Sequence, residues 1–163
     1  MKRIAWVNPD TDVLAICVPN YNNRTRPAGE TDDEFLARLV TERVPDGVSH
    51  IIFDDTDAGV TDFLAERTFR NGWSIDGSAV VVDMAKARVI HMDAIRKVRN
   101  KELAAKDITF MRAVEAGDTD AQSTIGTEKQ VLRDIPATFD ITTDVDTPEK
   151  LKGKWPTELP ARE

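Results

Sequence analysis

The feature that most constrains this chain is the stretch 84–116, which contains neither proline nor glycine. An average globular helix has only about 11–12 residues, so this stretch predicts one unusually long helix, with Asp83 as its N-cap. A second helical run, 118–134, follows directly and stops before Pro136. Gly117 between the two runs is a typical helix stop. The pattern therefore predicts a hairpin of two helices joined by a tight turn.

Short apolar runs predict a small antiparallel sheet in the first 82 residues. The four predicted strands are Lys2–Val7, Val13–Val18, Ser49–Phe53 and Ser78–Val82. The polar, proline-containing segment Pro19–Gly29 is predicted to be a loop that is open to proteases unless a partner covers it.

One helix is predicted to pack on this sheet. Thr31 and Glu34 have the spacing of a capping box, in which each side chain satisfies a backbone N–H group of the other. Apolar residues at helical spacing follow, and the Val44-Pro45 step ends the run.

These elements predict an α+β fold: a small N-terminal antiparallel sheet with one packed helix, a long helical hairpin and an extended C-terminal strap. The expected parts are residues 1–82, 83–134 and 135–163. Within the strap, Thr147-Pro148 predicts the start of a short helix that Leu151 and Trp155 anchor. The rest of the strap is polar and is expected to be accessible to proteases.

The apolar face of the long helix changes direction along its length. At about 100° per residue, the face in the first half includes Met84, Ala87, His91, Ala94, Ile95 and Val98. Beyond Asn100 it turns toward Leu103, Phe110 and Val114. Either the helix bends near Asn100, or its two halves pack on different partners. His91 is expected to be a core histidine with one hydrogen-bond partner.

The net charge of −7, from 29 acidic and 22 basic residues, disfavours nucleic acid as a partner because phosphate contacts require an excess of Lys and Arg. The long helix does carry a basic cluster: Arg88, Arg96, Lys97, Arg99 and Lys101. These residues spread around the helix and predict a solvated surface.

An acidic segment after the third strand suggests a metal site as an alternative. It contains Asp54, Asp55 and Asp57. A calcium loop requires glycine at its sixth position and glutamate at its twelfth, and no register that starts at Asp54 or Asp55 satisfies both. Phosphate-binding, nucleophile-elbow and Cys-x-x-Cys motifs are absent from the sequence. We therefore expect no enzyme activity and no cofactor.

A second alternative is a binding surface of aromatic and arginine side chains. Its residues are Arg67, Phe69, Arg70 and Trp73. Such mixed clusters occur at interfaces, but the four-residue spacing of Phe69 and Trp73 favours two core aromatics beside solvated arginines.

Four segments resemble small proteins encoded among the late structural genes, often near the tail-fibre genes, of tailed bacteriophages and prophages of proteobacteria. They are ERTFRNGW at 66–73, DMAKARVIHMDAIRKVRNKELAAKDITFMRAVEAGD at 83–118, EKQVLRDIP at 128–136 and TPEKLKGKWP at 147–156. The segment LRDIP at 132–136 also resembles the end of phage tail assembly chaperones. The N-terminal region lies outside the resemblance, which spans about residues 62 to 156.

The resemblance implies a virion or tail-assembly role, as a component or as a helper that is absent from the mature particle. The implied partner is a tail or tail-fibre protein, or a second copy of this chain, with no nucleic acid or membrane involved. The implied location is the tail region of the virion, or the host cytoplasm during assembly. The predicted interface lies on the hairpin: Leu103, Phe110, Met111, Val114, Ile125 and Leu132.

Overall fold

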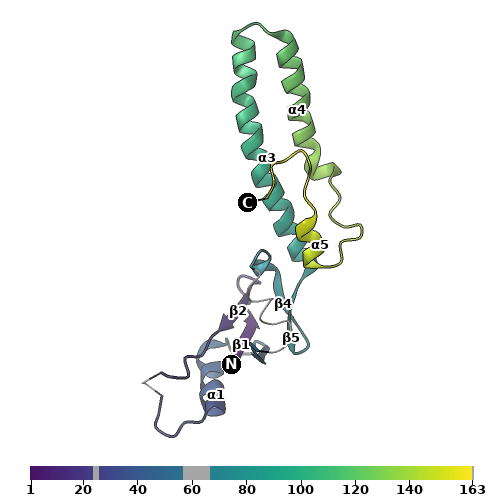
Figure 1. Cartoon of the computed structure of the whole chain (residues 1–163). Coiled ribbons are helices and arrows are strands. Elements are labelled where there is room, and N and C mark those ends of the chain that lie inside the picture. Colours follow the sequence, from purple (N-terminus) through teal and green to yellow (C-terminus); the bar gives the residue numbers. More distant parts are fainter. Residues whose placement is uncertain (24–25, 57–66, 163) are drawn as a thin grey trace. The chain divides into compact units, whose positions relative to one another are not determined.

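The computed structural model describes residues 1–23, 26–56 and 67–162. The chain divides into two compact units, Met1–Lys86 and Ala87–Glu163. The described residues of the first form small antiparallel sheets, the α-helix α1 and a short 3-10 helix, and the second contains the helical hairpin and the C-terminal segment (Figure 1). The predicted α+β fold class is confirmed.

A three-stranded antiparallel sheet forms the centre of the first unit. Its strands are β1 (Lys2–Val7), β2 (Leu14–Cys17) and β3 (His50–Asp54), in the order β2-β1-β3. The Asn8 side chain shapes the β1–β2 turn because its carbonyl oxygen accepts hydrogen bonds from the N–H groups of Asp10 and Thr11. Three predicted strands are thus confirmed.

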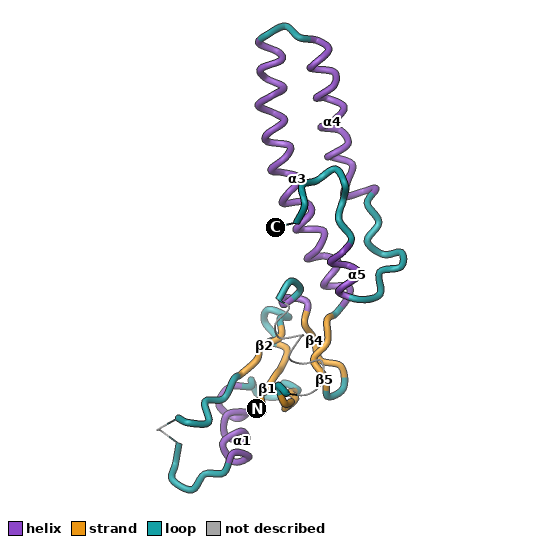
Figure 2. Tube along the Cα trace, in the orientation of Figure 1, coloured by secondary structure: helices purple, strands orange, loops and turns teal. Residues whose placement is uncertain are grey.

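Helix α1 (Asp32–Arg43) covers one face of this sheet (Figure 2). The capping box of Thr31 and Glu34 is present as predicted. Successive residues of a strand point to opposite faces, so Ile4 packs under α1 while Ala5 faces the other side. The helix contributes three buried side chains to the core beside Ile4: Phe35, Leu36 and Leu39.

The opposite face carries a second core built around Trp73. Ala5, Leu14 and Phe53 of the three-stranded sheet pack against Trp73, which follows the short 3-10 helix η1 (Arg70–Gly72).

Trp73 begins strand β4 (Trp73–Asp76), which pairs with β5 (Ala79–Val82) as a separate two-stranded ribbon. The predicted fourth strand therefore exists, but it lies outside the three-stranded sheet. Its partner β4 was missed. The two-residue link Gly77-Ser78 is a typical hairpin turn, and Gly77 adopts the positive φ of 57° that such turns require.

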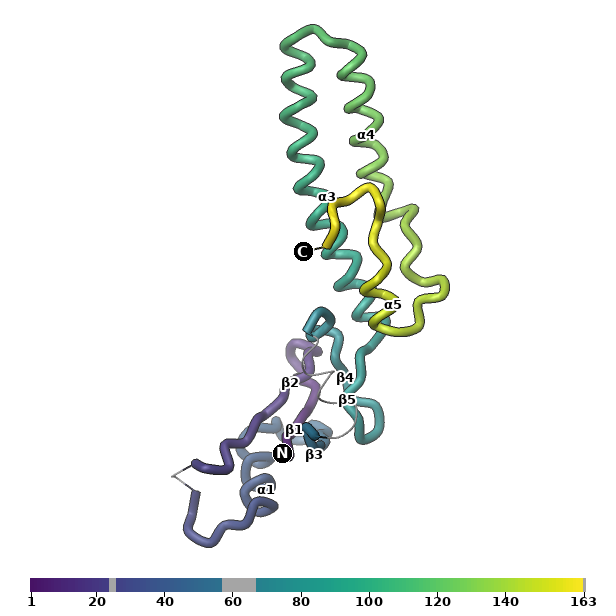
Figure 3. The backbone as a smooth tube through the Cα atoms, in the orientation of Figure 1, coloured from purple at the N-terminus to yellow at the C-terminus, as the bar shows by residue number. Residues whose placement is uncertain are grey.

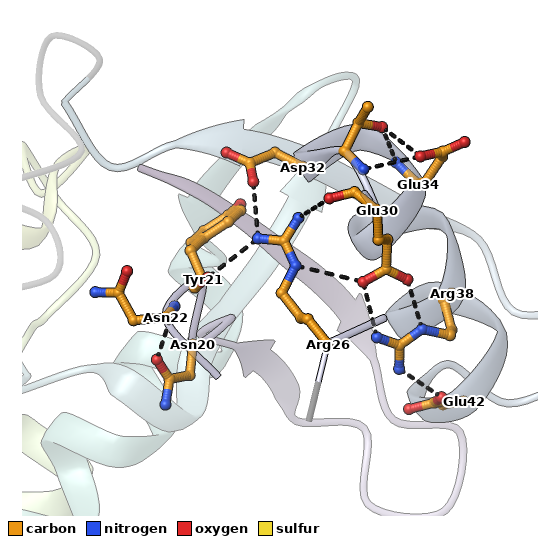
Figure 4. A network of polar contacts seen from close by, with 10 residues as sticks. Asn20, Tyr21, Asn22, Arg26, Glu30, Asp32, Glu34, Arg38 and Glu42 are labelled. Atoms are coloured by element: carbon orange, nitrogen blue, oxygen red, sulfur yellow. Dashed lines mark hydrogen bonds and ion pairs between the residues drawn. The ribbon is translucent and has the colours of Figure 1, made fainter. Parts of the chain in front are cut away.

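An ion-pair network fastens the described part of the Pro19–Gly29 loop to α1 (Figure 4). The Arg26 guanidinium donates to the carbonyl of Tyr21 at 3.0 Å and to the Asp32 carboxylate at 2.9 Å. Glu30 accepts two hydrogen bonds from Arg38, at 2.8 and 3.0 Å, and these hydrogen bonds lower the pKa of Glu30. The loop end at residues 26–30 is therefore more firmly held than its polar composition predicts.

The hairpin of the second unit consists of α3 (Met84–Glu115) and α4 (Thr119–Thr138), which run side by side in opposite directions (Figure 1). The carboxylate of Asp83 accepts from the N–H groups of Ala85 and Lys86, as expected of an N-cap. Gly117 turns the chain with a φ of 69°, and Asp118 caps α4. The hairpin and its turn are confirmed.

Pro136 does not end the second helix. Helix α4 continues through it to Thr138, and its C-cap is Phe139. A proline beyond the first turn of a helix removes one hydrogen bond, and its ring crowds the preceding turn. The helix nevertheless closes after Pro136, since the N–H of Phe139 donates to the carbonyl of Ile135 at 2.9 Å. The predicted end at residue 134 is therefore wrong by one turn.

The C-terminal segment returns along α3 (Figure 3). It contains the predicted short helix, α5 (Pro148–Gly153), which Thr147 caps. Four of its side chains are buried: Val145, Leu151, Pro156 and Leu159. The strap is therefore a packed part of the unit, and we no longer expect it to be open to proteases in the isolated chain.

Both halves of α3 pack against α4. In the first half, Ile95 joins a core cluster with Leu132 and Ile135 of α4 and Leu159 of the C-terminal segment. In the second half, α3 contacts α4 through ion pairs at residues 106 and 107. Helix α3 is continuous over its 32 residues, and its halves differ in that the core cluster of the first half also includes the C-terminal segment.

His91 is fully buried and ties α3 to the C-terminal segment. Its Nε2 lies 2.6 Å from the carbonyl oxygen of Lys154, so Nε2–H is the donor of a neutral imidazole. Arg162 approaches Nδ1 at 3.5 Å, and the Trp155 ring meets the imidazole edge-on. Burial lowers the pKa of His91, and the charge of Arg162 lowers it further, against the opposing effect of the Lys154 hydrogen bond.

Replacing Trp73 by Ala should lower the free energy of unfolding of the first unit by about 3–5 kcal/mol, because a buried aromatic side chain is lost. Urea unfolding measures this change. Arg70→Ala at an exposed neighbouring position is the control, and it should change stability by less than about 0.5 kcal/mol. A loss below about 1 kcal/mol for Trp73→Ala would contradict the packing described.

The second unit should lose stability as the pH falls from 7 to 5. Because the pKa of His91 is lower in the folded chain than in the unfolded one, the unfolded chain takes up a proton first, below pH about 6.5. The melting temperature across this range measures the effect. His91→Gln should remove most of this slope, whereas His50→Gln on the exposed β3 surface should retain it. An unchanged slope in His91→Gln would contradict this role of His91.

Candidate interaction surface on the helical hairpin

The inner side of the hairpin is where α3 and α4 contact each other beyond the core cluster. The Lys106 ammonium lies 2.5 Å from the Glu128 carboxylate, and Lys129 lies 2.5 Å from Asp107. The same Lys129 ammonium lies 4.9 Å from the centre of the Phe110 ring, a cation–π contact. These pairs place residues 106, 107 and 110 of α3 on the side that faces α4.

The six predicted interface residues divide between the interior and the surface. Leu132 is only 5% exposed and belongs to the core cluster, so its assignment to an exposed interface is wrong. Leu103, Phe110 and Ile125 are half-buried. Met111 and Val114 are exposed, at 55% and 43%. Of the six, only Met111 offers more than half of its surface to a partner.

The outer side of α3 presents an apolar stripe that sequence reasoning did not identify. Ile108 is 57% exposed, the largest value among the bulky side chains of the hairpin's distal half. At about 100° per residue, Ile108 lies roughly 160° around the helix from Phe110 and Lys106, which face α4. Ala104 and Met111, one turn before and after Ile108, are also exposed. We call Ala104, Ile108 and Met111 the outer stripe.

A helical wheel of residues 100–116 could have found the outer stripe. Ile108 was missed because the apolar positions Leu103, Phe110 and Val114 already accounted for a face at seven- and four-residue spacing.

Helix α4 adds one further exposed large apolar side chain, Val131 at 46%. Its neighbour Leu132 is buried, as expected for adjacent residues on a helix that packs on one side only.

The alternative surface of aromatic and arginine residues does not form. Phe69 and Trp73 are buried, and only Arg67 and Arg70 are exposed. The aromatic rings are therefore unavailable to a partner, and their interpretation as core residues is confirmed.

The acidic segment after β3 is held by positive groups of the same unit. Asp55 forms an ion pair with Arg3 at 2.8 Å, and the Met1 ammonium contacts both Asp54 and Asp55. This ammonium, and after it Arg3, lowers the pKa of Asp55. Asp57, the third predicted ligand, lies outside the described residues. Among residues 1–23, 26–56 and 67–162 there is no group of three or more His, Cys, Asp or Glu side chains that could hold a metal ion.

Within the part of the chain that the structure describes, no helix combines the length and apolar character needed to cross a membrane. Comparisons with family models, with curated proteins and with solved structures found no match to this chain.

Changing Ile108 to Glu should leave the fold intact, because the side chain already projects into solvent. We expect the free energy of unfolding to change by less than about 0.5 kcal/mol. The paired variant Leu132→Glu places a charge in the core cluster and should lower the free energy of unfolding by about 3 kcal/mol or more. Thermal unfolding followed by circular dichroism compares the two. Equal destabilisation by both variants would show that Ile108 is part of the core.

Proposed function

We propose that the chain is a non-enzymatic structural protein of a tailed bacteriophage, associated with the tail or tail fibres, that binds other virion proteins through its helical hairpin. The observation that carries this proposal is the outer stripe on α3, where Ile108 and Met111 are both more than half exposed. The sequence resemblance across about residues 62 to 156 supports the choice of a phage protein. It also supports a location in the virion tail region, or in the host cytoplasm during assembly.

The outer stripe is suited to a protein partner on physical grounds. Covering a half-exposed Ile or Met side chain stabilises a complex by roughly 1 kcal/mol each through the hydrophobic effect. The stripe lies on a helix whose opposite side contacts α4, so its backbone is already helical before a partner binds, which lowers the entropy cost of binding. Charged residues border it on α3, among them Lys101 and Glu115, and such rim charges select partners by complementarity.

A second candidate is an assembly chaperone for the tail fibre that is absent from the mature virion. The resemblance of LRDIP at 132–136 to the end of tail assembly chaperones favours it. In this chain Leu132 and Ile135 of that segment are core residues. These two side chains would therefore stabilise the hairpin and would not contact the partner themselves. Both candidates use the hairpin surface, and they differ only in whether the protein remains in the particle.

The test is mass spectrometry of purified particles of the phage that encodes this chain, together with affinity purification of the chain from infected cells. We expect a tail or tail-fibre protein to co-purify with the wild-type chain. The double variant Ile108→Glu/Met111→Glu should lose this partner, because it places charges in the outer stripe. Ser123→Glu/Thr124→Glu, at exposed positions of α4, is the matched control and should retain it.

Presence of the chain in particles identifies a virion component, and its absence together with a complex in infected cells identifies the chaperone. The proposal is wrong if the chain is absent from particles and no tail or tail-fibre protein co-purifies with it.

A further inference from the structure

Charge is segregated along the hairpin into a basic middle and an acidic tip. Residues 94–101 of α3 contain four bases and no acid, and residues 113–127 contain three acids and no base. The bases are Arg96, Lys97, Arg99 and Lys101, and the acids are Glu115, Asp118 and Asp120. The outer stripe lies between the two groups.

Four charged residues on either side of the outer stripe have no ion-pair or hydrogen-bond partner among the described residues. Arg96 is paired with Asp93 and Arg99 with Asn100, but Lys97 and Lys101 make no ion pair or hydrogen bond to any residue that the structure describes. The same is true of Glu115 and Asp120 within the described residues, and all four side chains are exposed.

Lys101 and Glu115 lie on the face of the outer stripe, as does Arg112 between them. Lys101, Ile108 and Glu115 follow one another at intervals of seven residues, which is about two helical turns, so they lie within roughly 40° of one another around α3. Lys101 and Glu115 are equally far from Ile108, on either side of it.

We propose that the outer face of α3 binds a second copy of this chain in an antiparallel, two-fold symmetric dimer with its axis beside Ile108. In such a dimer each contact occurs twice, with the roles of the copies exchanged. Ile108 meets Ile108, and Lys101 of each copy lies opposite Glu115 of the other. The same symmetry brings Lys97 next to the hairpin turn of the other copy, where Asp118 and Asp120 lie.

A groove beside the basic middle provides room for the acidic tip. It has a volume of about 320 Å³, and Lys97, Lys101 and Arg162 line it together with Val98 and Trp155. One acid, Glu102, also lines the groove, so its three cations leave a positive excess. That excess complements a tip that has acidic side chains and no basic ones over residues 113–127. A parallel dimer would instead place the basic groups of the two copies against each other, which disfavours that arrangement.

This inference rests on the proposed function in that both treat the outer face of α3 as an assembly surface. It adds the identity of the partner, a second copy, and the register of the contact.

The test uses charge reversal in the full chain. Lys97→Glu/Lys101→Glu replaces two bases of the basic middle by acids, and Glu115→Lys/Asp120→Lys replaces two acids of the acidic tip by bases. Sedimentation velocity of the wild type should show a dimer at low salt that weakens as salt is raised. Each double variant alone should raise the dimer dissociation constant by about 100-fold, because attraction becomes repulsion at the contacts of the changed residues. An equimolar mixture of the two variants should restore the dimer, since each acidic group then meets a basic one.

Arg43→Glu/Arg67→Glu is the matched control for the lysine variant, because it makes the same change in net charge at exposed positions of the first unit. It should dimerise as the wild type does, and circular dichroism should show that all variants retain their helix content. A wild type that stays monomeric at all concentrations would overturn the proposal. A mixture of the two variants that fails to dimerise would overturn the register.

These results are separable from those for the proposed function. A monomeric chain that still co-purifies with a tail protein removes only the dimer. A charge-dependent dimer without any virion partner removes only the phage role.

Discussion

The arrangement of the second unit depends on one apolar cluster at the base of the hairpin. Ile95, Leu132, Ile135 and Leu159 come from α3, α4 and the C-terminal segment, and they are the buried residues that hold these three together. His91 adds a directional contact, since a buried imidazole requires a hydrogen-bond partner and finds it in the Lys154 carbonyl. This cluster joins the C-terminal segment to both helices of the hairpin through Leu159.

Beyond this cluster the hairpin is held by few interactions. With 32 residues rising about 1.5 Å each, α3 is about 48 Å long. Its distal half meets α4 through two ion pairs, one of them made by the largely buried Lys129, and through a half-buried Phe110. The exposed Lys106–Glu128 pair contributes little to stability, so the distal half relies on helix propensity, the Gly117 turn and one face of packing. A single helix can cover only one side of another, which leaves the opposite side of α3 in solvent.

This geometry accounts for the surface chemistry of the distal hairpin. The half of α3 that is covered carries Phe110 and the ion pairs, while the uncovered half carries the outer stripe between charges of opposite sign. An apolar patch with charges of one sign at each end is specific in orientation, because a partner must match both ends. Both proposals for this chain follow from the same imbalance: two helices have apolar residues on more faces than they can bury against each other.

Local interactions explain which features of this chain the sequence alone determined. The capping box of Thr31 and Glu34, the Asp83 cap and the Gly117 turn each involve residues within a few positions of one another, so their spacing predicts them directly. The aromatic pair Phe69 and Trp73 was also assigned correctly to the core. Pro136 was misjudged because the cost of a proline depends on its position in the helix, and the helix end is set by how Ile135 packs.

Only the tertiary structure decided which apolar face of α3 is covered. The sequence places Leu103 and Phe110 on one face and Ile108 on another, but helical periodicity fixes only the angles between them. Which face meets α4 depends on the direction that the chain takes after Gly117. The burial of Leu151 was predicted from the sequence, but the burial of Val145 and Leu159 in the polar tail was not. Burial depends on contacts between residues far apart in the chain, and those contacts form only when the whole unit has folded.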